Sequence, residues 1–194
     1  MATVLLILIL PISSFCCTSG IFTGKVTADG RALLWKHRDT GEENNRIMFF
    51  KGEKYDFLAL VNSQDTTATA WAGTNSVGFS IMNTASYNLK TDKLKDADRE
   101  GELMYKALSL CKTLEDFEKF LRKQPKPLGV EANFGVIDAE GGAAYFETNN
   151  STFVKLDVND PRIAPDGYLI YTNFSYTGER DKGMGYIRYN TANE

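Results

Sequence analysis

The sequence predicts an α+β fold in which two groups of short strands flank one pair of helices. Strand-like runs precede residue 85, helical runs occupy residues 98–123, and strands resume at residue 133. Helices that are grouped together favour antiparallel sheets over alternating βαβ units. The 194 residues suit one domain with a sizeable core after a short leader.

An apolar leader precedes the first predicted strand. Residues 4–10 are uninterrupted apolar residues, and Ser14 and Cys16 stand at −3 and −1 of a cleavage position. We therefore expect residues 1–16 to be a signal peptide or short propeptide, and residues 17–194 to be a domain that is secreted or periplasmic. The run is far shorter than the roughly 20 residues that span a bilayer, so we expect no transmembrane segment. A lipid anchor on Cys16 is a less favoured alternative.

Cleavage after Cys16 makes Cys17 the first residue of the mature chain. A free α-amino group has an unperturbed pKa of about 7.7–8.0, close to working pH. One residue then supplies both a nucleophile and a proton acceptor. Cys17 is therefore a candidate catalytic residue.

The first half of the chain reads as two hairpins and two further strands. Residues 20–27 and 31–37 are predicted to pair across a two-residue turn at Asp29-Gly30. That register places Asp39 opposite Gly20, near the Cys17 amine. Strands are also predicted over residues 46–51 and 57–62. Residues 67–72 and 76–82 form a second hairpin through 73–75, with Asn83 at its end.

Two helices and four more strands follow. Residues 98–111 have helical spacing, and Thr113 is predicted to cap a second helix that ends at residue 123. Strands are predicted over residues 133–138, 143–148, 153–158 and 168–173, and a helix begins after residue 183. Cys111, Trp35 and Trp71 are expected in the core.

Composition excludes several classes of function. The net charge is −3 with acidic and basic residues interspersed, so no nucleic-acid surface is expected. His37 is the only histidine, and three cysteines provide too few ligands for a zinc site. There is no phosphate-binding glycine loop. We therefore expect neither a metal nor a cofactor.

Several motifs resemble known enzymes. Cys17-Thr18-Ser19 and residues 29–39, DGRALLWKHRD, resemble the start of N-terminal-nucleophile hydrolases. The nearest groups are the isopenicillin N acyltransferase family and the choloylglycine hydrolases, which include bile-salt hydrolases and penicillin V acylases. The likeness continues at residues 78–83 and 169–173. It implies an αββα sandwich of antiparallel sheets between helix layers. Members are longer, so it also implies a C-terminally incomplete chain that lacks the family's C-terminal arginine.

The resemblance also implies roles for individual residues. Cys17 is the nucleophile, Asp39 orients its amine and thiol, and Asn83 and Asn173 flank the oxyanion. Two basic residues flank His37 within residues 29–39: Lys36 and Arg38 are expected to be solvated, and either is a candidate for binding a substrate carboxylate.

The predicted function is hydrolysis of a linear, non-peptide C–N amide bond through a thioester on Cys17, with a small-molecule amide as substrate. One alternative is acyl transfer from coenzyme A to an amine, and another is a non-catalytic secreted binding domain. A cysteine endopeptidase is weaker, because only His37 offers a separate base. The sequence leaves open a homo-oligomer, and removal of the leader by a peptidase or autoproteolytic processing.

Overall fold

The computed structural model describes residues 16–65, 67–89 and 98–194, so most of the expected leader lies outside the described residues. These residues form two antiparallel sheets and three helices. The seven-stranded sheet has the order β3-β4-β5-β6-β7-β8-β9, and the three-stranded sheet has the order β10-β1-β2. The strands are β1 (Thr18–Phe22), β2 (Leu33–His37), β3 (Asn45–Phe50), β4 (Phe57–Asn62), β5 (Ala72–Asn75), β6 (Ser80–Ala85), β7 (Ala132–Ile137), β8 (Ala143–Thr148), β9 (Phe153–Asp157) and β10 (Tyr168–Tyr171), and the helices are α1 (Glu100–Leu110), α2 (Leu114–Lys123) and α3 (Tyr186–Ala192).

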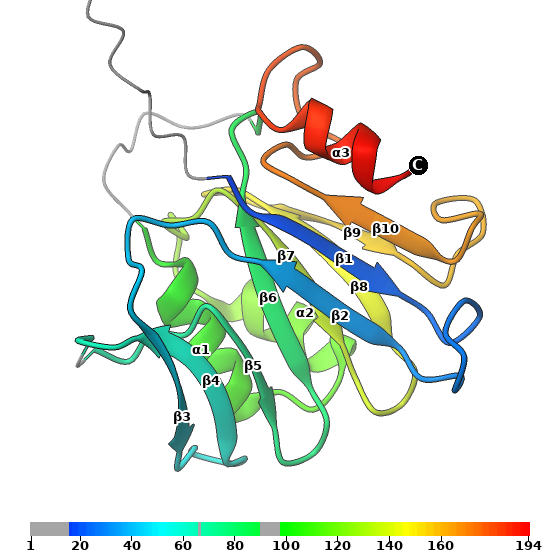
Figure 1. Ribbon diagram of the computed structural model, residues 1–194. Helices are drawn as coiled ribbons and strands as arrows, with labels where there is room; N and C mark the ends of the chain where they lie inside the picture. Colours follow the sequence, from blue (N-terminus) through cyan, green and yellow to red (C-terminus); the bar gives the residue numbers. More distant parts are fainter. Residues whose placement is uncertain (1–15, 66, 90–97) are drawn as a thin grey trace, which may run out of the picture.

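The elements stack in layers. Figure 1 shows α1 and α2 behind the seven-stranded sheet and the three-stranded sheet in front of β6–β8. The short helix α3 lies against β10. The predicted α+β class and the pair of antiparallel sheets are therefore confirmed, with α1 and α2 as one helix layer and α3 beside β10.

Two clusters of buried side chains hold these layers together. The cluster between the helices and the large sheet is centred on Phe117, whose ring contacts those of Phe79, Phe134 and Phe146 at centroid distances of 6.0, 5.9 and 5.0 Å. The cluster between the two sheets includes five fully or nearly buried side chains: Ile21, Met82, Tyr145, Leu169 and Tyr171.

The two core helices begin and end close to their predicted bounds. The Thr113 hydroxyl accepts the Asp116 N–H, so Thr113 caps α2 as predicted. Helix α1 begins at Glu100, two residues later than expected. Cys111 is 2% exposed, which confirms its place in the core.

The register of the first hairpin differs from the prediction. Gly20 pairs with Trp35, not with Asp39, and residues 23–32 form a long connection. The backbone N–H and the hydroxyl of Thr23 both donate to the carbonyl of Gly167, which ends the pairing of β1 with β2 early. Gly30, with φ of 73°, completes a local turn inside this connection.

The second hairpin is also displaced. Residues 67–71 lie outside any strand, and the turn falls at residues 76–79. The Asn75 carboxamide oxygen accepts the N–H groups of Val77 and Phe79, while Gly78 has φ of 86°, so side-chain capping places the turn after Asn75. As a result, Asn83 lies within β6, not at its end.

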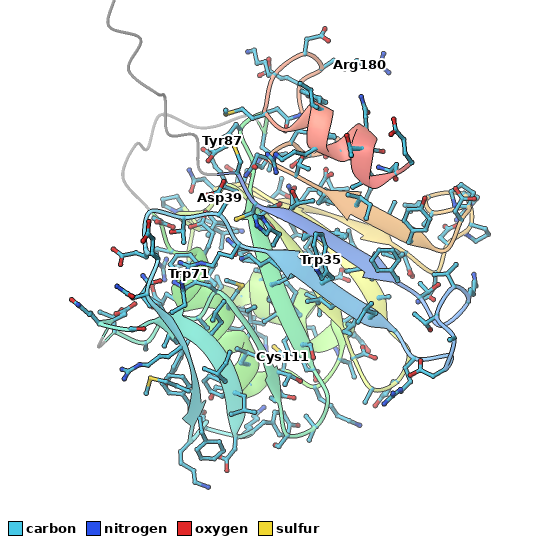
Figure 2. The ribbon with its side chains drawn as sticks, viewed as in Figure 1. Trp35, Asp39, Trp71, Tyr87, Cys111 and Arg180 are labelled. Carbon is cyan, nitrogen blue, oxygen red and sulfur yellow. The ribbon has the colours of Figure 1, made fainter. Side chains whose placement is uncertain are left out.

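The two tryptophans are less buried than predicted. Trp35 is 46% exposed, because it lies on the outer face of β2, and its expected core position is wrong. Trp71 is partly buried against the helix-side core. Figure 2 shows both side chains.

Among the described residues, no helix has the length and apolar character needed to cross a bilayer.

Removing the Phe117 ring should destabilise the domain strongly. Phe117→Ala leaves a cavity at the centre of the helix-side core, and we expect a loss of about 3–5 kcal/mol in the free energy of unfolding. Urea titration of the purified protein measures it. Val154→Ala, at a position that is 44% exposed, is the matched control and should change the free energy by less than about 1 kcal/mol. Equal losses in the two variants would contradict this view of the core.

Candidate active site

Cys17 directly precedes β1, beside the chain that follows β2. Its thiol donates to the Asp39 backbone carbonyl at a Sγ–O distance of 3.6 Å. The Asp39 carboxylate accepts the backbone N–H of Cys16 at 3.1 Å. The observed register brings this about, because Thr18 pairs with His37 and residue 39 therefore lies across from residue 16. Figure 2 shows Asp39 at this end of the molecule.

Lys36 is held inside the site. Its ammonium donates to the carboxamide oxygen of Asn83 at 2.9 Å and to the carbonyl of Trp71 at 2.8 Å. Burial lowers the pKa of Lys36 to about 8; the thiol of Cys17 raises this pKa, and the guanidinium of Arg38 lowers it further. The expectation that Lys36 is solvated is therefore wrong: strand alternation turns it toward the large sheet.

Arg38 is anchored as well. Its guanidinium lies 5.1 Å from the centre of the Trp71 ring and donates to the side-chain oxygens of Asn62, at 2.9 Å, and Asn45. Burial lowers the pKa of Arg38, and the charge of Cys17 opposes that shift. Arg38 is thus half-buried and not freely solvated as expected. Binding of a substrate carboxylate by Lys36 or Arg38 stays a prediction.

The two asparagines make different contacts. Asn83 uses its carboxamide oxygen for Lys36, which leaves its amide N–H groups available to a ligand, since no described residue accepts from them. Asn173 accepts from Arg188 at 3.0 Å, and its side-chain amide donates to the carbonyl of Ala85 at 3.1 Å. The backbone N–H of Asn173 donates to Met184, so that donor is already used.

Arg188, from α3, completes the cluster. Its guanidinium donates to the carbonyls of Cys16 at 2.9 Å and Cys17 at 2.7 Å, and to the hydroxyl of Thr18 at 2.8 Å. The expectation that the chain lacks a C-terminal arginine at the site is wrong. The sequence pattern that could have indicated this arginine is Gly-Met-Gly before a short helix. Gly185, with φ of 91°, caps the start of α3, and Arg188 in the first turn of that helix reaches Cys17.

The site contains two partly exposed thiols, those of Cys16 and Cys17. Cys17 is partly exposed, whereas burial raises the pKa of the Cys111 thiol to about 12. Within residues 16–65, 67–89 and 98–194, no group of three or more His, Cys, Asp or Glu side chains could hold a metal ion. The site brings together the thiol of Cys17, a carboxylate, a lysine, an arginine and amide donors.

No protein-family model and no curated protein matches the chain. The N-acylethanolamine-hydrolyzing acid amidase ortholog of Caenorhabditis elegans matches with a TM-score of 0.58 and 14% identity, over 82% of this chain and 70% of that one. A mutant of the conjugated bile acid hydrolase from Clostridium perfringens matches with a TM-score of 0.56 and 17% identity, over 83% of this chain and 54% of that one.

These structures confirm the fold implied by the resemblance, that of the N-terminal-nucleophile hydrolases. At 14% and 17% identity the likeness concerns the fold alone. The chain spans about half the length of the bile acid hydrolase.

The burial of Lys36 should make stability depend on pH. Its pKa is about 8 in the folded protein and 10.5 in the unfolded chain, so between these values the unfolded chain binds more protons. Raising the pH through this interval should therefore stabilise the wild type relative to Lys36→Met, by about 3 kcal/mol at most. Urea titrations of both proteins at a series of pH values measure the gap. Lys123→Met, at an exposed position, should show no such change, and a constant gap for Lys36→Met would refute the assignment.

Proposed function

We propose that the chain is an N-terminal-cysteine amidohydrolase that cleaves a linear, non-peptide C–N amide bond. The observation that supports this most directly is the position of Cys17, at the N-terminal end of β1. Its thiol and the preceding N–H contact Asp39, and the carbonyls of Cys16 and Cys17 accept from Arg188. The fold shared with two amide-bond hydrolases supports it further.

In this proposal the mature chain begins at Cys17 after removal of residues 1–16 from an exported precursor. The carboxylate of Asp39 now holds the N–H of Cys16. Once that residue is gone, the same carboxylate is left beside the new α-ammonium group of Cys17. Opposite charges at this distance attract, so Asp39 would orient the amine next to the thiol.

The reaction then uses the new α-amino group, the thiol of Cys17, the Asn83 amide and a water molecule. The neutral α-amino group takes the thiol proton of Cys17, and the thiolate that results attacks the amide carbonyl carbon. The Asn83 amide donates to the developing oxyanion; such a donor is worth about 2.7–4 kcal/mol in another enzyme. The α-ammonium protonates the departing nitrogen as the C–N bond breaks. Water adds to the thioester, releases the acid and restores the thiol.

Lys36 and Arg38 contribute positive charge on the inner side of β2. Lys36 also fixes the Asn83 carboxamide by occupying its oxygen, so the amide nitrogen is the part that can reach a substrate. In this proposal both residues prepare other groups for the reaction.

Replacing the nucleophile should abolish activity without unfolding the protein. Cys17→Ala should fold and show no turnover of a small amide. Cys111→Ala is the matched control, and we expect it to keep activity because Cys111 lies in the core away from the chemistry. Release of the amine product, followed by fluorescence with a coumarin amide, measures both. Turnover by Cys17→Ala would refute the mechanism.

Intact mass before and after alkylation tests the mature start separately. A chain that begins at Cys17 and is alkylated there faster than at Cys111 fits the proposal. A retained or lipidated Cys16 would deny Cys17 a free amine and contradict it.

Arg188 should act as a positioning residue for the nucleophile. Arg188→Met removes hydrogen bonds to the carbonyl of Cys17 and to Asn173, and we expect kcat to fall about ten- to hundredfold. Arg180→Met is the control, because Arg180 is exposed on the loop before α3 (Figure 2). Arg188→Lys should recover part of the rate if charge contributes. Equal rates for Arg188→Met and Arg180→Met would rule this role out.

A further inference from the structure

A buried carboxylate holds the loop that leads to α3. Glu147, in β8, is 2% exposed and accepts four hydrogen bonds from neutral groups. Its Oε1 atom accepts from the hydroxyl of Tyr171 at 2.7 Å and from the backbone N–H of Tyr176 at 2.5 Å. Its Oε2 atom accepts from the backbone N–H of Thr177 at 3.0 Å and from the hydroxyl of the same residue. Because a buried carboxylate is costly without such bonds, the loop is tied to β8 at this point.

The loop supports one side of α3. The ring of Tyr176 meets the ring of Tyr189 edge-on, at a centroid distance of 6.0 Å. The ring of Phe174, in the same loop, also contacts Tyr189, at a centroid distance of 5.2 Å. Tyr189 directly follows Arg188 in the helix. The position of Tyr176 therefore helps to set the point from which the Arg188 side chain extends.

Helix α3 depends on these contacts from outside. It has seven residues, and none of them is buried. Helices of this length are not stable by themselves in water, because their few hydrogen bonds do not offset the cost of nucleation. The guanidinium of Arg188 extends from α3 to the carbonyl of Cys17 at 2.7 Å and to the side-chain oxygen of Asn173 at 3.0 Å. Its placement against the nucleophile therefore depends on how firmly the loop is held.

We infer that Glu147 is a positioning residue for the nucleophile, acting through Tyr176 and α3 on the guanidinium of Arg188. This inference rests on the proposed function. A buried ionic group is a poor means of stabilising a fold, because apolar side chains of similar size often serve as well or better. A carboxylate has a different use here. Its two oxygens accept from the N–H groups of two successive loop residues, which fixes the direction of the loop backbone.

A double-mutant cycle on the purified protein tests the inference. Glu147→Gln keeps the size of the side chain but places an amide NH2 group, which accepts no hydrogen bond, where a carboxylate oxygen stood. We expect kcat for a small amide to fall about tenfold, with KM little changed. In an Arg188→Met background the same substitution should lower kcat by less than about twofold, because both residues act along one path. Glu140→Gln, at an exposed position on the turn between β7 and β8, is the matched control and should leave kcat unchanged.

Two further variants separate positioning from a loss of stability. Phe117→Leu weakens the helix-side core without touching the loop. It should leave kcat unchanged at a temperature where circular dichroism shows every variant folded. Thr177→Val removes one donor to Glu147 but keeps the backbone N–H and the branched shape of the side chain. It should lower kcat about two- to threefold, and only while Arg188 is present. If Glu147→Gln does not fold, the cycle is made with Thr177→Val.

Two results would overturn the inference: an unchanged kcat in both Glu147→Gln and Thr177→Val, or losses that multiply when Glu147→Gln is combined with Arg188→Met. The rate at which iodoacetamide alkylates Cys17 is a readout that needs no turnover. That rate should change in each single variant, and the double variant should match Arg188→Met; equal rates in all four proteins also overturn the inference. A wild type without turnover of any amide refutes the proposed function alone, and the alkylation rates then decide the role of Glu147.

Discussion

The antiparallel pairing of β1 with two neighbours determines where most groups of the candidate site lie, while Asn83 comes from β6 of the large sheet. Because β1 is the central strand of the small sheet, the residue before it is flanked by β2 and by the chain that follows β10. One neighbour supplies Lys36, Arg38 and Asp39, and the other leads to Asn173 and then to α3. A shift of one residue on either side would turn these side chains away from Cys17.

Among the groups of the candidate site, the ammonium of Lys36 has the largest free-energy cost of burial. A lysine amine that leaves water loses hydration, and this loss is what lowers its pKa. The carboxamide of Asn83 and the carbonyl of Trp71 offset part of the loss. A residue kept at such a cost, next to a thiol, fits a role in chemistry better than a role in stability.

Patterns that are local in the sequence predicted the fold well. Details that depend on contacts between distant residues were predicted wrongly. The cap at Thr113 and the buried stripe with Cys111 depend on neighbours in sequence, and both were found as expected. The first hairpin depends on Thr23 contacting Gly167, which no local pattern encodes, so its register was wrong although Asp39 was rightly placed beside the nucleophile region. Lys36 and Arg188 were misjudged for the same reason: their partners come from other elements.

The contact of Arg188 with Cys17 also joins positions 171 residues apart. Contacts of such high sequence separation form late in folding, because the intervening chain must first be ordered. During synthesis, which proceeds from the N-terminus at about 5–20 residues per second, Cys17 is made many seconds before the arginine that contacts its backbone. The order of translation therefore leaves the backbone of Cys17 without this contact until residue 188 has been made.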